Sequence, residues 1–184
     1  MTIYLIRHGS TTAGENHLYC GSSNVPLSDN GRALLTKADF TPDVLISSPL
    51  MRCIETSQIL FPNTKIKISS ELREMDFGRF ELHSYEQLKT DTQYIDWITD
   101  ETGDYVCPGG ESKNSFFDRI SKTFVREVSL LNCNTAAFVL HGGVIGAIME
   151  LYCTEKKPYY EWKPPYGGGF VLDYNTSLTF IRKY

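Results

Sequence analysis

The chain has 184 residues, 41% of them hydrophobic and 22% charged, so a single globular domain over residues 1–184 with a sizeable buried core is expected. The net charge of -4 argues against nucleic acid as a partner, because nucleic-acid-binding proteins usually carry a basic surface. No stretch is apolar enough to span a membrane, no signal peptide is apparent, and the five cysteines lack zinc-type spacing, so a cytoplasmic protein with reduced thiols and no membrane partner is expected.

The first predicted element is a strand over residues 2–6, an apolar run rich in β-branched and aromatic residues. It stops at Arg7-His8-Gly9, where an arginine and a histidine precede a glycine that lets the backbone turn tightly. Ligands of open α/β sheets bind beyond the carboxyl ends of strands. A cation beside an imidazole at such an end indicates nucleophilic attack on an anion such as phosphate. The alternative is an Arg-His pair that faces solvent.

Helices and strands alternate along the rest of the chain, after a polar, turn-rich segment that runs to about Asn30. The predicted helices cover residues 28–38, 48–61, 84–98, 112–131 and 144–152, and the predicted strands cover 43–47, 65–68, 136–140, and a hairpin of 170–174 and 178–181 across Asn175-Thr176. Ser28, Ser48 and Ser84 are the expected helix caps. The alternation predicts an α/β fold, a three-layer sandwich with a mostly parallel central sheet between helices and one antiparallel edge strand.

Polar side chains follow three of the predicted strands. His8 follows the first, Ser47-Ser48 follows the second with Arg52 in the next helix, and His141 follows strand 136–140 before two glycines. Parallel neighbours would gather two arginines, two histidines and helix N-terminal amides at one edge, an arrangement that suits three phosphoryl oxygens. Taken singly, Arg52 is also consistent with an exposed helix residue, and His141 with a histidine packed beside a glycine turn.

Five segments in order resemble the histidine phosphatase superfamily, which includes the cofactor-dependent phosphoglycerate mutases. They are RHG (7–9), SSPLMRCIETS (47–57), ELREMDFGRFE (71–81), PGGES (108–112) and LHGGV (140–144), and the resemblance covers nearly the whole chain. It implies five catalytic residues, His8, Glu74, Arg7, Arg52 and His141. The substrate-binding residues expected with them are Arg7, Arg52, His141, Gly142, Cys20, Gly21 and Thr11.

The resemblance implies a phosphohistidine intermediate on His8. Arginine and histidine side chains would hold the phosphoryl oxygens, and Glu74 would protonate the leaving oxygen and then take a proton from the attacking water. No metal and no cofactor is expected, because the arginines take the role of a cation. A solvated loop carboxylate is the alternative reading of Glu74, and Asp76 is a less favoured acid.

Two positions depart from the family pattern. Many members carry an asparagine near the phosphate where this chain has Gly14, and many read W-E-G where this chain reads Phe80-Glu81-Leu82. Either the amide of Gly14 substitutes for the asparagine or the loop has a different course. Both departures concern substrate contacts more than the core chemistry.

The expected function is hydrolysis of a phosphomonoester on a small phosphorylated metabolite. The segment over residues 81–108 is short, whereas mutases of the family usually carry insertions that shield the phosphoenzyme from water. Residues 7–21 and 26–28 resemble the α-ribazole phosphatases of cobalamin assembly, and Tyr19, Trp162 and Tyr166 are candidates to stack on a substrate base. The alternatives are a phosphoglycerate mutase and a non-catalytic phospho-ligand-binding protein. The oligomeric state is left open, with a homodimer as one alternative.

Overall fold

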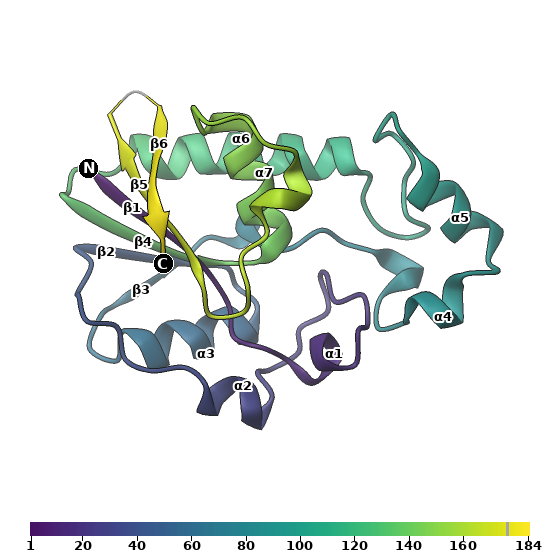
Figure 1. The fold of residues 1–184 in the computed structure, drawn as a ribbon, viewed down its shortest axis with the longest axis horizontal. Coiled ribbons are helices and arrows are strands. Elements are labelled where there is room, and N and C mark those ends of the chain that lie inside the picture. The colour runs from purple at the N-terminus through teal and green to yellow at the C-terminus, as the bar shows by residue number, and fades with distance from the viewer. Residues whose placement is uncertain (176) are drawn as a thin grey trace.

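The computed structural model describes residues 1–175 and 177–184, which form one six-stranded sheet (Figure 1). The strands are β1 (Thr2–Arg7), β2 (Val44–Ser47), β3 (Ile66–Ile68), β4 (Thr135–Leu140), β5 (Gly169–Tyr174) and β6 (Leu178–Lys183), in the order β3-β2-β4-β1-β5-β6. The first four strands pair in parallel, and β5 runs antiparallel to both β1 and β6. The predicted α/β fold with a mostly parallel sheet is confirmed; the antiparallel strand β5 lies one position in from the edge, which β6 forms. Thr176 of the predicted hairpin turn lies outside the described residues.

Helices cover both faces of the sheet, which gives the expected three layers (Figure 1). They are α1 (Thr12–Glu15), α2 (Asp29–Ala33), α3 (Met51–Leu60), α4 (Tyr85–Leu88), α5 (Thr92–Thr99), α6 (Lys113–Ser129) and α7 (Gly142–Tyr152), with 3-10 turns at Ser70–Leu72, Gly78–Phe80 and Tyr159–Trp162. Helices α6 and α7 cover one face and α3 covers the other, while α1, α4 and α5 lie beyond the carboxyl ends of the parallel strands.

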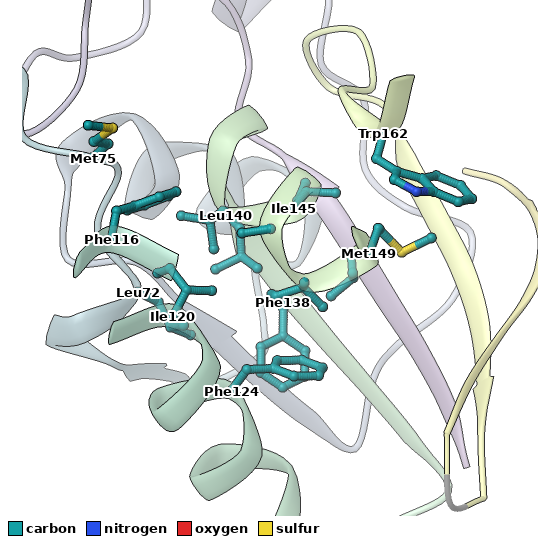
Figure 2. Close-up of a cluster of buried hydrophobic side chains, with 14 of the residues drawn as sticks. Leu72, Met75, Phe116, Ile120, Phe124, Phe138, Leu140, Ile145, Met149 and Trp162 are labelled. Carbon is teal, nitrogen blue, oxygen red and sulfur yellow. The ribbon is translucent and has the colours of Figure 1, made fainter. Parts of the chain in front are cut away.

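The core is divided between the two faces because successive strand residues point to opposite sides. Leu5 and Phe138 belong to the larger cluster under α6 and α7, whereas their neighbours Ile6 and Val139 belong to the cluster under α3. Figure 2 shows the larger cluster, in which Phe124 of α6 stacks near Phe138 of β4. Burial on both faces explains why the inner parallel strands β1, β2 and β4 are mostly apolar runs, whereas the edge strand β3 carries Lys67 and is partly exposed.

Three helix predictions are wrong in part. Helix α2 ends at Ala33 because the following chain turns, and Leu35 packs on the cluster under α3. Residues 84–98 form two helices, since the Asp91 side chain caps a new helix by accepting from the amides of Gln93 and Tyr94. Helix α3 begins at Met51 and has no side-chain cap.

All five cysteines are free, as the sequence predicts. None of the helices in residues 1–175 and 177–184 combines the length and the apolar character that crossing a membrane requires.

Candidate active site

Three strand ends meet at one edge of the sheet. Strand β4 lies between β1 and β2, and their registers pair Arg7 with Leu140 and Ser47 with Val139. The next residue along each strand is therefore His8, Ser48 or His141. The imidazole rings of His8 and His141 lie 5.2 Å apart between centroids. The geometry thus brings together the side chains that the sequence places after separate strands.

Hydrogen bonds define which nitrogen of His8 carries the lone pair. The Nε–H group of Arg52 points at Nε2 of His8 over 3.3 Å, and a guanidinium can only donate, so Nε2 carries the lone pair. The proton is then on Nδ1, which donates to the carbonyl of Gly9 over 2.6 Å. At 3.3 Å the hydrogen bond from Arg52 is long and weak. Little free energy is therefore lost when a phosphorus atom takes its place at Nε2.

Both histidines are held in the neutral form. Burial lowers the pKa of His8 well below its ordinary value of 6.5, and the charge of Arg52 and, to a smaller degree, that of Arg7 lower it further. The pKa of His141 is lowered well below 6.5 by burial first and by Arg52 second. A nucleophilic imidazole must be unprotonated, so this environment keeps His8 ready to attack at neutral pH.

Arg52 is fully buried and is fixed by backbone carbonyls rather than by a carboxylate. Its Nη1 donates to the Ser23 carbonyl over 2.7 Å, and its Nη2 donates to the Gly21 carbonyl over 2.6 Å. Glu81 fixes the loop of residues 21–23, because its carboxylate accepts from the amides of Gly21 and Ser22 at 3.0 and 2.8 Å. Glu81 is a positioning residue that sequence reasoning missed, although it lies at the end of one of the five recognised segments.

Arg7 leaves a buried donor free at the site. Its Nη1 donates to the Pro164 carbonyl over 2.8 Å, and its guanidinium lies 3.8 Å over the ring of Tyr166. Its Nε is buried and has no hydrogen-bond partner among the described residues. A buried N–H without an acceptor costs free energy, so this group is suited to a ligand oxygen.

Glu74 lies across the cavity on the loop after β3, with 9% of its surface exposed. Its Oε2 accepts from the amide of Gly143 at the start of α7 over 2.8 Å, and its Oε1 accepts from the amide of Met75 over 3.0 Å. These two amides fix the carboxylate beside the helix N-terminus, where negative charge is favoured. Glu74 is therefore not the solvated loop carboxylate that the sequence left as an alternative.

Ser48 does not cap a helix, contrary to the sequence prediction. Its hydroxyl lies 2.6 Å from Nε2 of His141, and the helix that it was expected to cap begins three residues later. The thiol of Cys53 lies 3.5 Å from the same nitrogen, and burial raises the pKa of this thiol to about 12, so it stays protonated. Ser48 and Cys53 thus orient His141, a role that no local sequence signal indicates.

The departure at Gly14 has a steric explanation. The hydroxyl of Thr11 caps α1 by accepting from the amide of Gly14 over 3.0 Å, so this amide is not free for a ligand. A side chain at position 14 would begin 2.2 Å from the hydroxyl oxygen of Tyr166. Tyr166 therefore takes the space that a side chain at position 14 would fill.

At the second departure, Leu82 adopts a φ of 59°, a left-handed conformation that glycine adopts without strain.

Arg7, His8 and Glu74 line a cavity of 170 Å³, whereas Arg52 and His141 are fully buried and are not among its lining residues. Its lining residues are Arg7, His8, Thr11, Leu18, Tyr19, Cys20, Glu74, Phe77, Gly142, Gly143, Lys163 and Tyr166. Thr11, Cys20 and Gly142 line it as the sequence suggests, whereas Gly21 lies behind Arg52. Trp162, a suggested stacking residue, is 1% exposed and lies in the core (Figure 2), with its ring centroid 5.4 Å from that of Phe170. Lys163 was missed, since nothing in its local sequence marks it.

The cavity carries unbalanced positive charge. Within residues 1–175 and 177–184, neither Arg7 nor Arg52 forms an ion pair with a carboxylate. Two guanidinium groups without anionic partners favour a bound dianion with several oxygens. A neutral imidazole facing that anion at the carboxyl edge of a parallel sheet is the arrangement of an enzyme that transfers phosphoryl groups.

Comparison with known proteins gives the family. Residues 3–181 match the Histidine phosphatase superfamily (branch 1), and the chain belongs to this family. The adenosylcobalamin/alpha-ribazole phosphatase of Salmonella typhimurium is 29% identical over 84% of this chain and 80% of its own length. The crystal structure of the alpha-ribazole phosphatase from Shigella flexneri superposes with a TM-score of 0.85, with 25% identity over 98% of this chain and 96% of that one. A probable phosphoglycerate mutase, GpmB of Salmonella choleraesuis, is 26% identical over 82% of this chain and 74% of its own length. The resemblance read from the five segments is thus confirmed, and the chain is an enzyme of the phosphatase class.

The folded state is expected to lose stability as the pH falls below about 6.5, the ordinary pKa of histidine. The pKa values of His8 and His141 are lowered in the folded state, so the unfolded chain takes up protons first and unfolding becomes more favourable. Each histidine then contributes up to about 1.4 kcal/mol per pH unit until its folded pKa is reached. Urea unfolding at pH 7.5 and pH 5 measures this loss. His141→Gln should reduce the pH dependence, whereas His83→Gln, at an exposed position, should leave it unchanged.

Replacing Gly143 with alanine is expected to lower kcat about 10- to 100-fold with little loss of stability. The new methyl group would lie 2.3 Å from Oε1 of Glu74 and 2.8 Å from the hydroxyl oxygen of Tyr159, so the carboxylate must move. Alanine favours the helix by about 1 kcal/mol over glycine, which offsets part of the strain. Steady-state kinetics with an aryl phosphate and thermal unfolding together separate the two effects. A wild-type kcat would show that the position of Glu74 does not limit the reaction.

Proposed function

We propose that this chain, acting as one domain over residues 1–184, hydrolyses the phosphomonoester of a small metabolite through a phosphohistidine on His8. The observation that carries the proposal is the neutral imidazole of His8 between two guanidinium groups that have no carboxylate partner in the described residues. Glu74 lines the same cavity and supplies the acid and base that ester hydrolysis needs.

In the first step, Nε2 of His8 attacks phosphorus and forms the P–N bond as the bond from phosphorus to the ester oxygen breaks. The free Nε–H of Arg7, together with Arg52 and His141, holds the other phosphoryl oxygens and stabilises their charge in the transition state. Glu74 takes up a proton when the phosphate dianion binds beside it, and it gives this proton to the leaving oxygen, so the organic product departs as an alcohol. The hydrogen bond from Nδ1 to the Gly9 carbonyl stabilises the positive charge that the ring gains.

In the second step, water attacks the phosphohistidine. Glu74, now a carboxylate, takes a proton from the water as the P–N bond breaks. Inorganic phosphate leaves, and both His8 and Glu74 return to their starting protonation states. The arginines provide the positive charge that a metal ion provides in other phosphatases, so neither a metal nor a cofactor is part of the proposal.

The first candidate substrate is α-ribazole phosphate. Two relatives that match most of the chain carry this activity in their names, and the short segment between Glu81 and Pro108 favours hydrolysis over mutase transfer. A relative named as a probable phosphoglycerate mutase keeps mutase activity as the second candidate. A non-catalytic phospho-ligand-binding protein is disfavoured by the presence of both His8 and Glu74. We further propose a cytoplasmic location and no nucleic-acid partner, in keeping with five free thiols and a net charge of -4.

A panel of phosphomonoesters tests this proposal. Purified protein is incubated with α-ribazole 5′-phosphate, 3-phosphoglycerate and sugar phosphates, and released inorganic phosphate is measured. We expect stoichiometric phosphate release from at least one ester, with the same rate after treatment with EDTA. Interconversion of phosphoglycerates after priming with a bisphosphate, with little phosphate release, would favour the mutase. Binding without turnover of any ester would overturn the hydrolase proposal.

A further inference from the structure

A second cavity adjoins the catalytic one. Its volume is 330 Å³, about twice the 170 Å³ of the catalytic cavity, and the two share Tyr19, Phe77 and Lys163 as lining residues. Typical small-molecule sites have volumes of roughly 300–1,000 Å³, so the catalytic cavity alone holds little more than a phosphoryl group. The organic part of a substrate must therefore extend beyond it.

The second cavity lies on the side from which the leaving group departs. The proposed acid, Glu74, must be next to the leaving oxygen in order to protonate it. Met75 follows Glu74 directly, and Phe77 lies two residues further on; both line the second cavity. The hydroxyl of Tyr159, another lining residue, and the carboxylate of Glu74 both lie next to Gly143, within 2.8 and 2.3 Å of where its Cβ would be. Burial first, and then the charge of Glu74, raise the pKa of this phenol.

Aromatic rings from two separate parts of the chain line this cavity. Tyr19, Phe77 and Trp97 form one group, with edge-to-face contacts at centroid distances of 5.5 to 5.6 Å. Phe117 and Tyr159 form the other group, at 5.5 Å. No ring of the first group stacks on a ring of the second among the described residues, so the cavity separates them. Exposed aromatic faces at a cavity favour a flat, apolar ring as ligand.

The charged groups that line the second cavity are compatible with the binding of an aromatic ring. The ammonium of Lys163 lies 4.8 Å from the ring centroid of Tyr159, and that of Lys113 lies 5.4 Å from the centroid of Phe117. Neither lysine forms an ion pair within residues 1–175 and 177–184, so both are available for the electron-rich face of a ligand ring. Asp100, the one carboxylate among the lining residues, accepts from the Thr102 and Tyr105 amides and is committed to its own loop.

We propose that the second cavity is a leaving-group subsite that binds a planar aromatic ring of the substrate, and that it makes the enzyme selective for phosphomonoesters of aromatic nucleosides. This inference rests on the proposed function, because it takes the catalytic cavity as the phosphate site. The subsite places the ring beyond Glu74, on the side of the catalytic cavity from which the leaving group departs.

Two substrates that share the ester bond test the subsite. Ribose 5-phosphate and α-ribazole 5′-phosphate have the same leaving oxygen, but only the second carries an aromatic base. We expect kcat/KM to be about tenfold or more higher for the second, which corresponds to about 1.4 kcal/mol of ring binding. Equal values, or a higher kcat/KM for the anionic 3-phosphoglycerate, would overturn the subsite.

Two matched variants on α5 locate the effect. Ile98 lines the cavity and is 47% exposed, so Ile98→Trp fills the subsite with little effect on folding, whereas Ile95, at 39% exposure, lies outside the cavity lining. Ile98→Trp should reduce the ratio of the two kcat/KM values at least about fivefold, and Ile95→Trp should leave the ratio unchanged. Phe117→Leu removes one ring of the subsite and is a second variant that should also reduce the ratio of the two kcat/KM values.

The outcomes separate this inference from the proposed function. If neither ester releases phosphate above the level of His8→Ala, the proposed function fails. If both esters are hydrolysed with equal kcat/KM, or if Ile98→Trp and Ile95→Trp change the ratio equally, the hydrolase stands and the aromatic subsite is wrong.

Discussion

Replacing His8 with alanine is expected to abolish phosphate release, with a loss in kcat of at least about 10⁴-fold. The variant lacks the imidazole that forms the P–N bond in the proposed mechanism, and the remaining cations can bind phosphate without transferring it. His8 is 6% exposed, so its removal leaves a small cavity but does not unpair a salt bridge. Release of inorganic phosphate from an aryl phosphate measures the loss.

The same variant should not retain label from a radioactive phosphomonoester after a rapid quench in base, whereas the wild-type protein should retain up to one equivalent as acid-labile phosphohistidine. His83→Ala is the matched control, because His83 is an exposed histidine outside the cavity. Phosphate release by His8→Ala within tenfold of the wild-type rate would exclude a phosphohistidine on this residue.

Replacing Glu74 with glutamine is expected to lower kcat for an alkyl phosphate about 10²- to 10⁴-fold. Glutamine keeps the shape of the side chain but cannot protonate the leaving oxygen or accept a proton from water. It also places an amide group where two backbone amides now donate to carboxylate oxygens. Steady-state kinetics with an alkyl phosphate measures the combined loss.

An activated aryl phosphate separates the two roles of Glu74. A nitrophenolate leaves without protonation, so phosphorylation of His8 should remain fast in Glu74→Gln while hydrolysis of the phosphoenzyme is slow. Stopped-flow measurement should therefore show a burst of up to one equivalent of nitrophenolate, followed by slow turnover. Asp76→Asn is the control, since Asp76 holds the turn at Gly78 and does not line the cavity. A larger loss in Asp76→Asn than in Glu74→Gln would assign the acid to Asp76.

Local sequence signals predicted those elements whose determinants lie within a few residues of each other. The apolar run after Thr2 forms β1, and the Ser84 capping box with Gln87 forms as expected. The long helix after the Gly109-Gly110 turn is capped by Ser112, within a residue of its predicted start. Each of these features depends on contacts between residues at most four positions apart or on apolar periodicity, and both are visible in a single sequence.

Predictions failed where a distant partner competes for a local signal. Ser48 followed by Pro49 is a strong helix-start pattern, yet the Ser48 hydroxyl pairs with His141, 93 residues away. Asp91 is a different case: it interrupts the helical pattern of 84–98 through a local contact, because its carboxylate accepts from two amides of a new helix, those of Gln93 and Tyr94. The sequence could not weigh the pairing of Ser48, since that pairing requires knowing which strand ends are neighbours.

The sequence by itself determined the family of this protein and the groups that we propose to react: the Arg-His-Gly at the end of the first strand, and the second arginine and histidine after two further strands. Only the tertiary structure decided how these groups are tuned. Burial and the adjacent Arg52 hold His8 neutral, and Glu81 fixes the loop that holds Arg52. The same holds for the aromatic cavity beside Glu74, because its rings come from segments between 19 and 159 that only folding brings together. The identity and order of the residues can be read from short stretches of the sequence, whereas pKa values and cavities arise from contacts between distant parts of the chain.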